Sequence, residues 1–137
     1  MNIFIVDLKH TPGELAKATE AVARKGVNIT AFAGVTCGGS GEVAWLTDDD
    51  VQARRALSEG GFHVKELEVV PVTFANSPGS LAKTARKLAD AGINIEAALP
   101  ITMTPDKVTL ALATDQPAKA RGILGITEPV GASSSYR

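Results

Sequence analysis

One sequence pattern occurs twice in this chain, 66 residues apart. Residues 11–17 read TPGELAK and are followed by GVNI at 26–29, whereas residues 77–83 read SPGSLAK and are followed by GINI at 92–95. Over the 21 positions that start at Pro12, ten residues are identical in the two copies. Such agreement between residues of mixed type indicates a tandem duplication. We therefore expect one domain over residues 1–66, a second over 67–130 and a flexible tail at 131–137.

Each copy of the pattern predicts the start of a helix. Thr11 and Ser77 are favourable N-caps, and the proline that follows suits the first helical position because it has no amide hydrogen to leave unpaired. Glu14 completes a capping box with Thr11. The first helix is expected from Pro12 to about Lys25, with an apolar core stripe of Leu15, Thr19, Val22 and Ala23 that recurs in the second copy as Leu81, Ala85, Leu88 and Ala89.

The glycine after each proline indicates a close approach. At the second helical position a missing side chain leaves the unpaired amide hydrogens of the first turn open to a small anion. Glycine is unfavourable inside a helix, so its presence at both Gly13 and Gly79 suggests that a ligand or a neighbouring strand comes near the backbone.

Alternating apolar residues predict the strands of each unit. In the first copy the strands are expected at residues 2–8, 28–36 and 42–47, and a glycine-rich hairpin at 38–41 connects the last two. A second helix is expected to start near Asp48 and to reach Glu59, and a fourth strand follows it. Residues 62–74 hold the junction of the copies, where Pro71 is expected to mark a bend. In the second copy, residues 126–130 are the only candidate for the last strand.

The element order gives the fold class. Strand, helix, strand, strand, helix, strand predicts an α+β protein of two ferredoxin-like βαββαβ units in tandem, each an antiparallel sheet with both helices on one face. On the other face Ile3, Ile5, Phe32 and Leu46 are apolar, so we expect a second unit or a second chain to cover them.

Composition excludes several functions. The net charge is −1 and the 14 basic residues form no run, so nucleic acid is not an expected partner. No long apolar run predicts a membrane span, and a single cysteine excludes an intrachain disulfide framework, which together favour a cytoplasmic protein. No acid and base pair, activated nucleophile or metal cluster recurs, so no catalytic residue, metal site or cofactor is expected. The acidic run at 48–50 is interpreted as a helix start.

The repeated pattern resembles that of the ACT domain, the small-molecule regulatory module of amino-acid metabolism. The shared features are Pro-Gly-x-Leu-Ala-Lys and, sixteen residues after the proline, Gly-hydrophobic-Asn-Ile; they cover nearly the whole chain, twice. The resemblance implies units that pair, with an amino acid bound between the loop before the first helix of one unit and the start of the second strand of its partner. The same resemblance implies a metabolic enzyme as a possible partner, whereas the apolar outer face of the sheet implies a homodimer.

The resemblance also implies the binding residues. In the serine-regulated dehydrogenase branch of this family, a polar residue two before the proline and the asparagine after the Gly-hydrophobic pair hold the ligand. These positions are His10 with Asn28 in the first copy and Asn76 with Asn94 in the second. A histidine that this branch uses four before the proline is absent, since Leu8 and Phe74 stand there. The full candidate set is His10, Thr11, Pro12, Gly13, Glu14, Leu15, Asn28 and Ile29 in the first copy, and Asn76, Ser77, Pro78, Gly79, Ser80, Leu81, Asn94 and Ile95 in the second.

Two alternatives stay open at this point. Asn28 and Asn94 could be turn residues that tolerate an unusual backbone angle, and His10 could be a solvated loop residue. The whole protein could be an adaptor that dimerises or docks on a metabolic enzyme without binding any small molecule. An amino-acid sensor and such an adaptor differ in whether an amino acid stabilises the fold.

Overall fold

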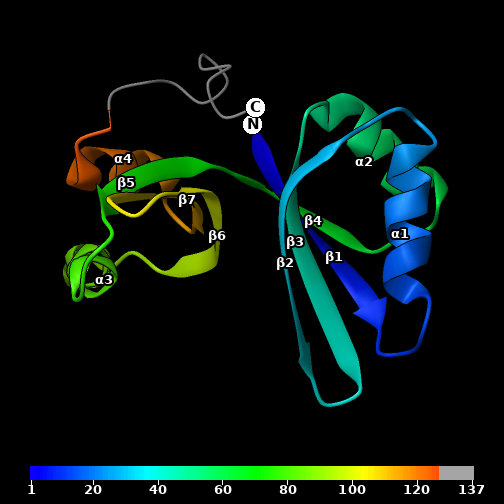
Figure 1. The fold of residues 1–137 in the computed structure, drawn as a ribbon, viewed down its shortest axis with the longest axis horizontal. Helices are drawn as coiled ribbons and strands as arrows, with labels where there is room; N and C mark the ends of the chain where they lie inside the picture. The colour runs from blue at the N-terminus through cyan, green and yellow to red at the C-terminus, as the bar shows by residue number, and fades with distance from the viewer. Residues whose placement is uncertain (127–137) are drawn as a thin grey trace. The chain divides into compact units, whose positions relative to one another are not determined.

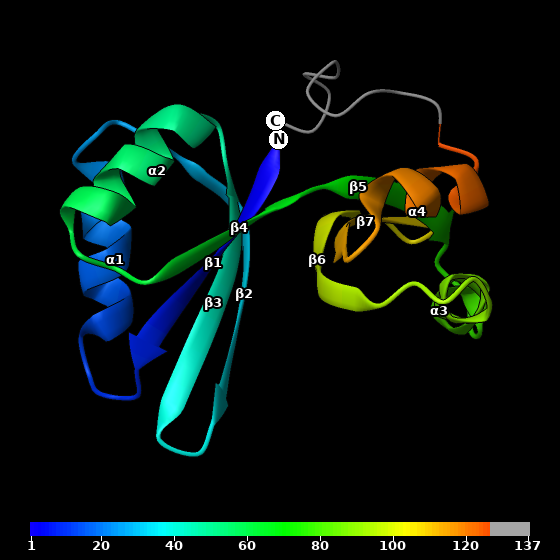
Figure 2. The same ribbon diagram turned by 180° about the vertical axis from the view of Figure 1, so that it is seen from behind.

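The structure is a computed structural model that describes residues 1–126 and divides into two compact units (Figures 1 and 2). The N-terminal unit spans Asn2–Leu67, and the C-terminal unit begins at Glu68 and includes Met1. In the part of the chain that the structure describes, no helix is long and apolar enough to cross a membrane.

The N-terminal unit has the predicted βαββαβ order. Its elements are β1 (Asn2–Lys9), α1 (Glu14–Ala23), β2 (Ile29–Cys37), β3 (Ser40–Thr47), α2 (Asp50–Glu59) and β4 (Val64–Glu68). The four strands form an antiparallel sheet in the order β2-β3-β1-β4, and both helices cover one face of it (Figure 1). The ferredoxin-like prediction is confirmed.

The core of this unit lies between the sheet and the helices. Phe4, Val6 and Trp45 project from the strands and are fully buried. From α1 the buried residues are Ala18, Ala21 and Val22. The predicted helix stripe is therefore wrong at its ends, because Leu15 is 46% exposed and Ala23 is exposed as well.

The C-terminal unit repeats the arrangement over the described residues. Its elements are β5 (Val70–Ala75), α3 (Ser80–Asp90), β6 (Ile95–Met103), β7 (Lys107–Thr114) and α4 (Pro117–Leu124), with strand order β5-β7-β6. Val70, Leu88 and Leu112 belong to its core. The strand expected at 126–130 and the tail expected at 131–137 lie outside the described residues, apart from Ile126, which is in no strand.

Val69 separates the strands of the two copies, and the prediction of a bend at Pro71 is wrong. Val69 separates β4 from β5, whereas Pro71 lies inside β5 opposite Ala111 of β7. Among the described strands β5 is an edge strand of its sheet. Proline is tolerated there because one side of an edge strand has no ladder hydrogen bond to lose.

An irregularity in β2 changes which residues face the helices. The pairing of β2 with β3 shifts between Ile29 and Ala31, so that Phe32 lies opposite Trp45, which itself lies opposite Phe4 of β1. Because directly paired residues project from the same face of a sheet, Phe32 shares the helix-covered face with the core residues Trp45 and Phe4. Its expected place on the opposite face is therefore wrong.

Candidate functional site

The two Pro-Gly pairs form type II turns in front of the helices. Gly13 has φ 92° and ψ −10°, Gly79 has φ 87° and ψ −10°, and α1 and α3 begin at the residues that follow them. The amide of Glu14 donates to the carbonyl of Thr11 over 3.4 Å, which closes the first turn. Proline at the second position, glycine with positive φ at the third and this hydrogen bond define a type II turn.

The expected helix starts at Pro12 and Pro78 are thus wrong. No side chain caps α1 or α3, so the predicted capping roles of Thr11 and Ser77 are wrong too. The glycines are explained by their positive φ, because a β-carbon built on either would meet nothing within 4 Å. The first amide of each helix is bonded within the turn, from Glu14 to Thr11 and from Ser80 to Ser77, whereas the next two amides have no hydrogen-bond partner among the described residues and remain available to an anion.

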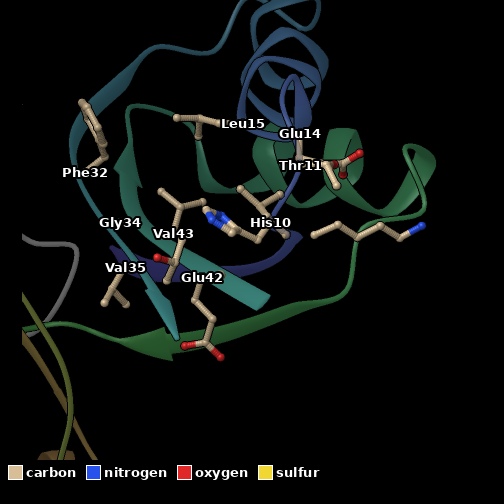
Figure 3. Close-up of a pocket in the computed structure, with 13 residues that line it drawn as sticks. His10, Thr11, Glu14, Leu15, Phe32, Gly34, Val35, Glu42 and Val43 are labelled. Carbon is tan, nitrogen blue, oxygen red and sulfur yellow. The ribbon is translucent and has the colours of Figure 1, made fainter. Parts of the chain in front are cut away.

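A pocket of about 330 Å³ lies beside the turn of the N-terminal unit, between the β1–α1 loop and the end of β2 (Figure 3). Four predicted site residues line it, namely His10, Thr11, Glu14 and Leu15. In Figure 3 the imidazole of His10 extends toward Val43 and β2, whereas the carboxylate of Glu42 points away. Pro12 and Gly13 shape the turn and do not line the pocket.

A second hollow of about 390 Å³ adjoins this pocket. It lies between α1 and β2 and is lined by Leu15, Ala16, Thr19, Ile29, Phe32 and Trp45. Leu15 and Phe32 line both spaces, and they are 46% and 65% exposed. We call the two spaces together the α1–β2 groove. Sequence reasoning missed Phe32 and Trp45 as site residues, because the face on which Phe32 lies depends on the irregularity in β2.

The groove changes character along its length. Near His10 it is bordered by polar side chains and by the uncapped start of α1. In the second hollow the only hydroxyl is that of Thr19, which donates to the carbonyls of Leu15 and Ala16 within the helix. The indole Nε1 of Trp45 is buried and has no hydrogen-bond partner among the described residues. The second hollow therefore presents an apolar surface.

The predicted asparagines lie just before β2 and β6. The amide of Asn28 donates to Asp48 Oδ1 over 2.9 Å, and Asn94 makes the same bond to Asp115 Oδ1 over 2.9 Å. The backbone of each aspartate returns a bond to the asparagine carbonyl over 3.1 Å. Neither asparagine has a positive φ, so the interpretation as residues that tolerate an unusual backbone angle is wrong. Both are exposed, and a ligand role for their side chains stays a prediction.

Asn28 and His10 lie at opposite ends of the N-terminal unit. Strands β1 and β2 both run antiparallel to β3 and are parallel to each other, so the end of β1 that leads to His10 lies far from the start of β2. Leu8 and Thr36 share a row of the sheet through Gly41, and Asn28 is separated from that row by roughly 25 Å of strand. One unit alone cannot bring both predicted residues to one amino acid.

The C-terminal unit presents a different loop. The side-chain amide of Asn76 donates to the carbonyl of Thr104 over 2.8 Å, and its backbone amide donates to that of Asp106 over 2.8 Å. The hydroxyls of Ser77 and Ser80 hydrogen-bond to each other over 2.9 Å. Asn76 therefore ties its loop to the β6–β7 turn, whereas no hydrogen bond ties the imidazole of His10 within the described residues.

The remaining predicted residues of the second copy are found at the surface. Pro78 and Gly79 form the exposed turn, Leu81 is 57% exposed at the start of α3, and Ile95 is 36% exposed at the start of β6. Within residues 1–126 no group of three His, Cys, Asp or Glu side chains could hold a metal ion. The acidic run at 48–50 instead supports the fold, since Asp49 caps α2 and Asp48 holds Asn28.

The fold is shared with several solved structures. Protein BT0572 from Bacteroides thetaiotaomicron is 23% identical over 90% of this chain and 85% of its own, with a TM-score of 0.76. The ligand-free regulatory subunit of aspartate kinase from Thermus thermophilus is 19% identical over 93% and 91%, with a TM-score of 0.64. A structure of aspartokinase alpha and beta subunits gives 22% identity over 89% of both chains and a TM-score of 0.60. No family model and no curated protein matches the sequence.

Proposed function

We propose that this chain, which has the fold of a tandem ACT-domain protein, is a regulatory protein that binds a small amino acid and relays its level to a metabolic enzyme. The observation that carries the proposal is the open pocket at the uncapped start of α1, with His10 beside it. Regulatory subunits of aspartate kinase share the fold along nearly their whole length, which supports a regulatory role without catalysis.

The start of α1 supplies the chemistry for an amino acid's carboxylate. Backbone amides at a helix N-terminus are unpaired, and the helix dipole favours a negative charge there. His10 adds a side-chain donor or acceptor on the same side. The ammonium group would be met by Asn28 of a second chain, because Asn28 of the same unit is too far away. The protein then works as a homodimer.

The C-terminal unit offers a second, unequal site. Its turn and its helix start have the same backbone geometry as those of the first unit. Its polar residue, Asn76, is already bonded to Thr104, so binding there competes with a loop contact. We therefore expect the first unit to bind the amino acid more tightly.

A thermal-unfolding screen with the twenty amino acids tests the proposal. A ligand present at about 100 times its Kd stabilises the folded state by about 2.7 kcal/mol, so one or a few amino acids should raise Tm. If no amino acid raises Tm at millimolar concentration, the protein is the ligand-independent adaptor and the proposal is wrong.

The two histidines of the chain allow a test of the site, with one as the variant and the other as its control. His10→Ala should lower the affinity for the stabilising amino acid by about tenfold, as expected for one lost hydrogen bond. His63 is the other histidine of the chain, it is exposed, and it does not line the pocket. Calorimetry should therefore give the wild-type affinity for His63→Ala. Equal affinities for both variants would remove His10 from the site.

A further inference from the structure

We infer that the α1–β2 groove of the N-terminal unit selects an amino acid with a large apolar side chain, such as leucine, isoleucine or phenylalanine. The inference rests on the proposed function and names the ligand class. The head group of the amino acid lies at the turn before α1, and its side chain lies in the second hollow against Phe32 and Trp45.

Continuity of the two spaces is the first argument. Leu15 and Phe32 line both the pocket at the turn and the hollow beneath α1. Their volumes, about 330 and 390 Å³, are each at the lower end of the range of small-molecule sites. A ligand whose head group is held at the turn thus has a path for its side chain between α1 and β2.

Charge and polarity are the second argument, because they match the two ends of such an amino acid. The turn end offers unpaired amides, an imidazole and the side chain of Glu14, which suit a zwitterion. The hollow offers Leu15, Ile29 and the two aromatic residues, while the hydroxyl of Thr19 is already bonded to the helix backbone. Apart from the buried indole Nε1 of Trp45, the hollow offers no unpaired polar side-chain group, so a polar side chain would lose hydrogen bonds to water there that the hollow replaces at most once.

Exposure of the groove residues is the third argument. Leu15 and Phe32 keep large apolar areas in contact with water although they project toward the helix-covered side of the sheet. A ligand side chain between them removes that area from water, which is favourable in proportion to the apolar surface buried.

The second copy lacks this hollow's aromatic wall. In the register of its sheet, Ala98 lies opposite Leu112, where the first copy has Phe32 opposite Trp45. The selectivity for a large apolar side chain therefore belongs to the N-terminal unit, with one such site in each chain.

Trp45 reports on the groove directly, because it is the only tryptophan in the chain. Binding of leucine to the full-length protein should change its emission, and calorimetry should give an affinity at least about tenfold higher for leucine than for serine or aspartate. Phe32→Ala should lower the affinity for leucine by about tenfold and that for serine by less, so that the preference for leucine over serine is reduced. Met103→Ala is the control, since Met103 is an equally exposed apolar residue on the edge strand β6 of the other unit.

Three outcomes would overturn the inference, and they differ from failure of the proposed function. Serine or aspartate binding as tightly as leucine, or Phe32→Ala behaving like Met103→Ala, would leave the sensor intact and remove the apolar selectivity. Emission of Trp45 that does not change at saturating leucine would show that the ligand's side chain lies outside the groove. If no amino acid binds at all, the proposed function itself is wrong.

Discussion

Gly13 and Gly79 occupy the same position in two type II turns, and both have a positive φ. Residues with a side chain adopt this conformation only at a cost of roughly 1–2 kcal/mol, whereas glycine adopts it freely. A β-carbon at either position would point into open space, so the cost is one of backbone conformation alone. The two glycines are therefore what permit the turns in front of α1 and α3.

Substitution of one glycine tests this explanation. Gly79→Ala should lower the free energy of unfolding by roughly 1–2 kcal/mol, and Gly79→Asn by less, because asparagine tolerates the left-handed region better. Gly122 serves as the control, because it lies inside α4 and has no positive φ. Gly122→Ala should therefore raise the free energy of unfolding by about 0.5–1 kcal/mol. Urea unfolding measures all three. Equal effects at both glycines would contradict the turn assignment.

Between elements, the Arg54–Glu66 ion pair links α2 to β4. The guanidinium donates two hydrogen bonds of 2.7 Å to the carboxylate of Glu66, which Asn2 also contacts. The hydrogen bonds from Arg54 hold the pKa of Glu66 below its ordinary value, against the smaller opposing effect of burial. A lowered folded-state pKa means that the stabilisation is present above the unfolded pKa of about 4.3 and is lost as the pH falls through the folded value.

The free energy of unfolding, measured as a function of pH, should therefore distinguish the effect of the Arg54–Glu66 pair from that of an exposed carboxylate. Glu66→Gln should be less stable than the wild type by about 1 kcal/mol or less at pH 7, because Arg54 is half exposed and solvent screens the pair. The difference should shrink once the pH drops below about 4. Glu20→Gln on the exposed side of α1 serves as the control. If the difference in the free energy of unfolding between Glu66→Gln and the wild type is the same at pH 7 and pH 3, the ion pair is not its cause.

The elements themselves could be predicted from the sequence to different degrees. The duplicated pattern and the alternating strands were enough for the βαββαβ order, because hydrophobic periodicity follows directly from burial. The turn at Pro12 cannot be predicted in this way, because proline has nearly the same φ at the start of a helix and in a type II turn. The face of Phe32 depended on a one-residue irregularity near Thr30, which reverses the alternation and leaves no mark in composition.

The candidate site was only partly predictable for the same reasons. The resemblance to the ACT domain implies ligand binding at the loop before the first helix, and His10, Thr11, Glu14 and Leu15 of that region line the pocket at the turn. Leu15 was assigned to the core, as an apolar residue at helical spacing usually is, yet it borders the groove. Trp45 lies in the core and also forms one wall of the hollow. A residue that serves both roles cannot be distinguished by its type.

At the scale of the whole molecule, the separation of His10 and Asn28 decides how a binding site can be assembled. The two residues lie at opposite ends of parallel strands, so a single unit cannot place both on one amino acid. A two-fold symmetric pair of chains brings the same surface of each together and creates two equivalent composite sites. The proposed homodimer is therefore a requirement of the proposed binding mode.

Mixing two variants that each weaken the site of the N-terminal unit tests this requirement. His10→Ala and Asn28→Ala each damage one half of every composite site, and neither should bind the amino acid well alone. If the halves come from different chains, a heterodimer of the two variants has one site with both damaged residues and one with none. After exchange of subunits, about half of the dimers are heterodimers, so calorimetry should recover about a quarter of the wild-type sites at wild-type affinity. Sedimentation of each variant provides the control that both still dimerise. Absence of any recovered binding in an exchanged mixture would show that Asn28 of one chain does not serve the loop of another.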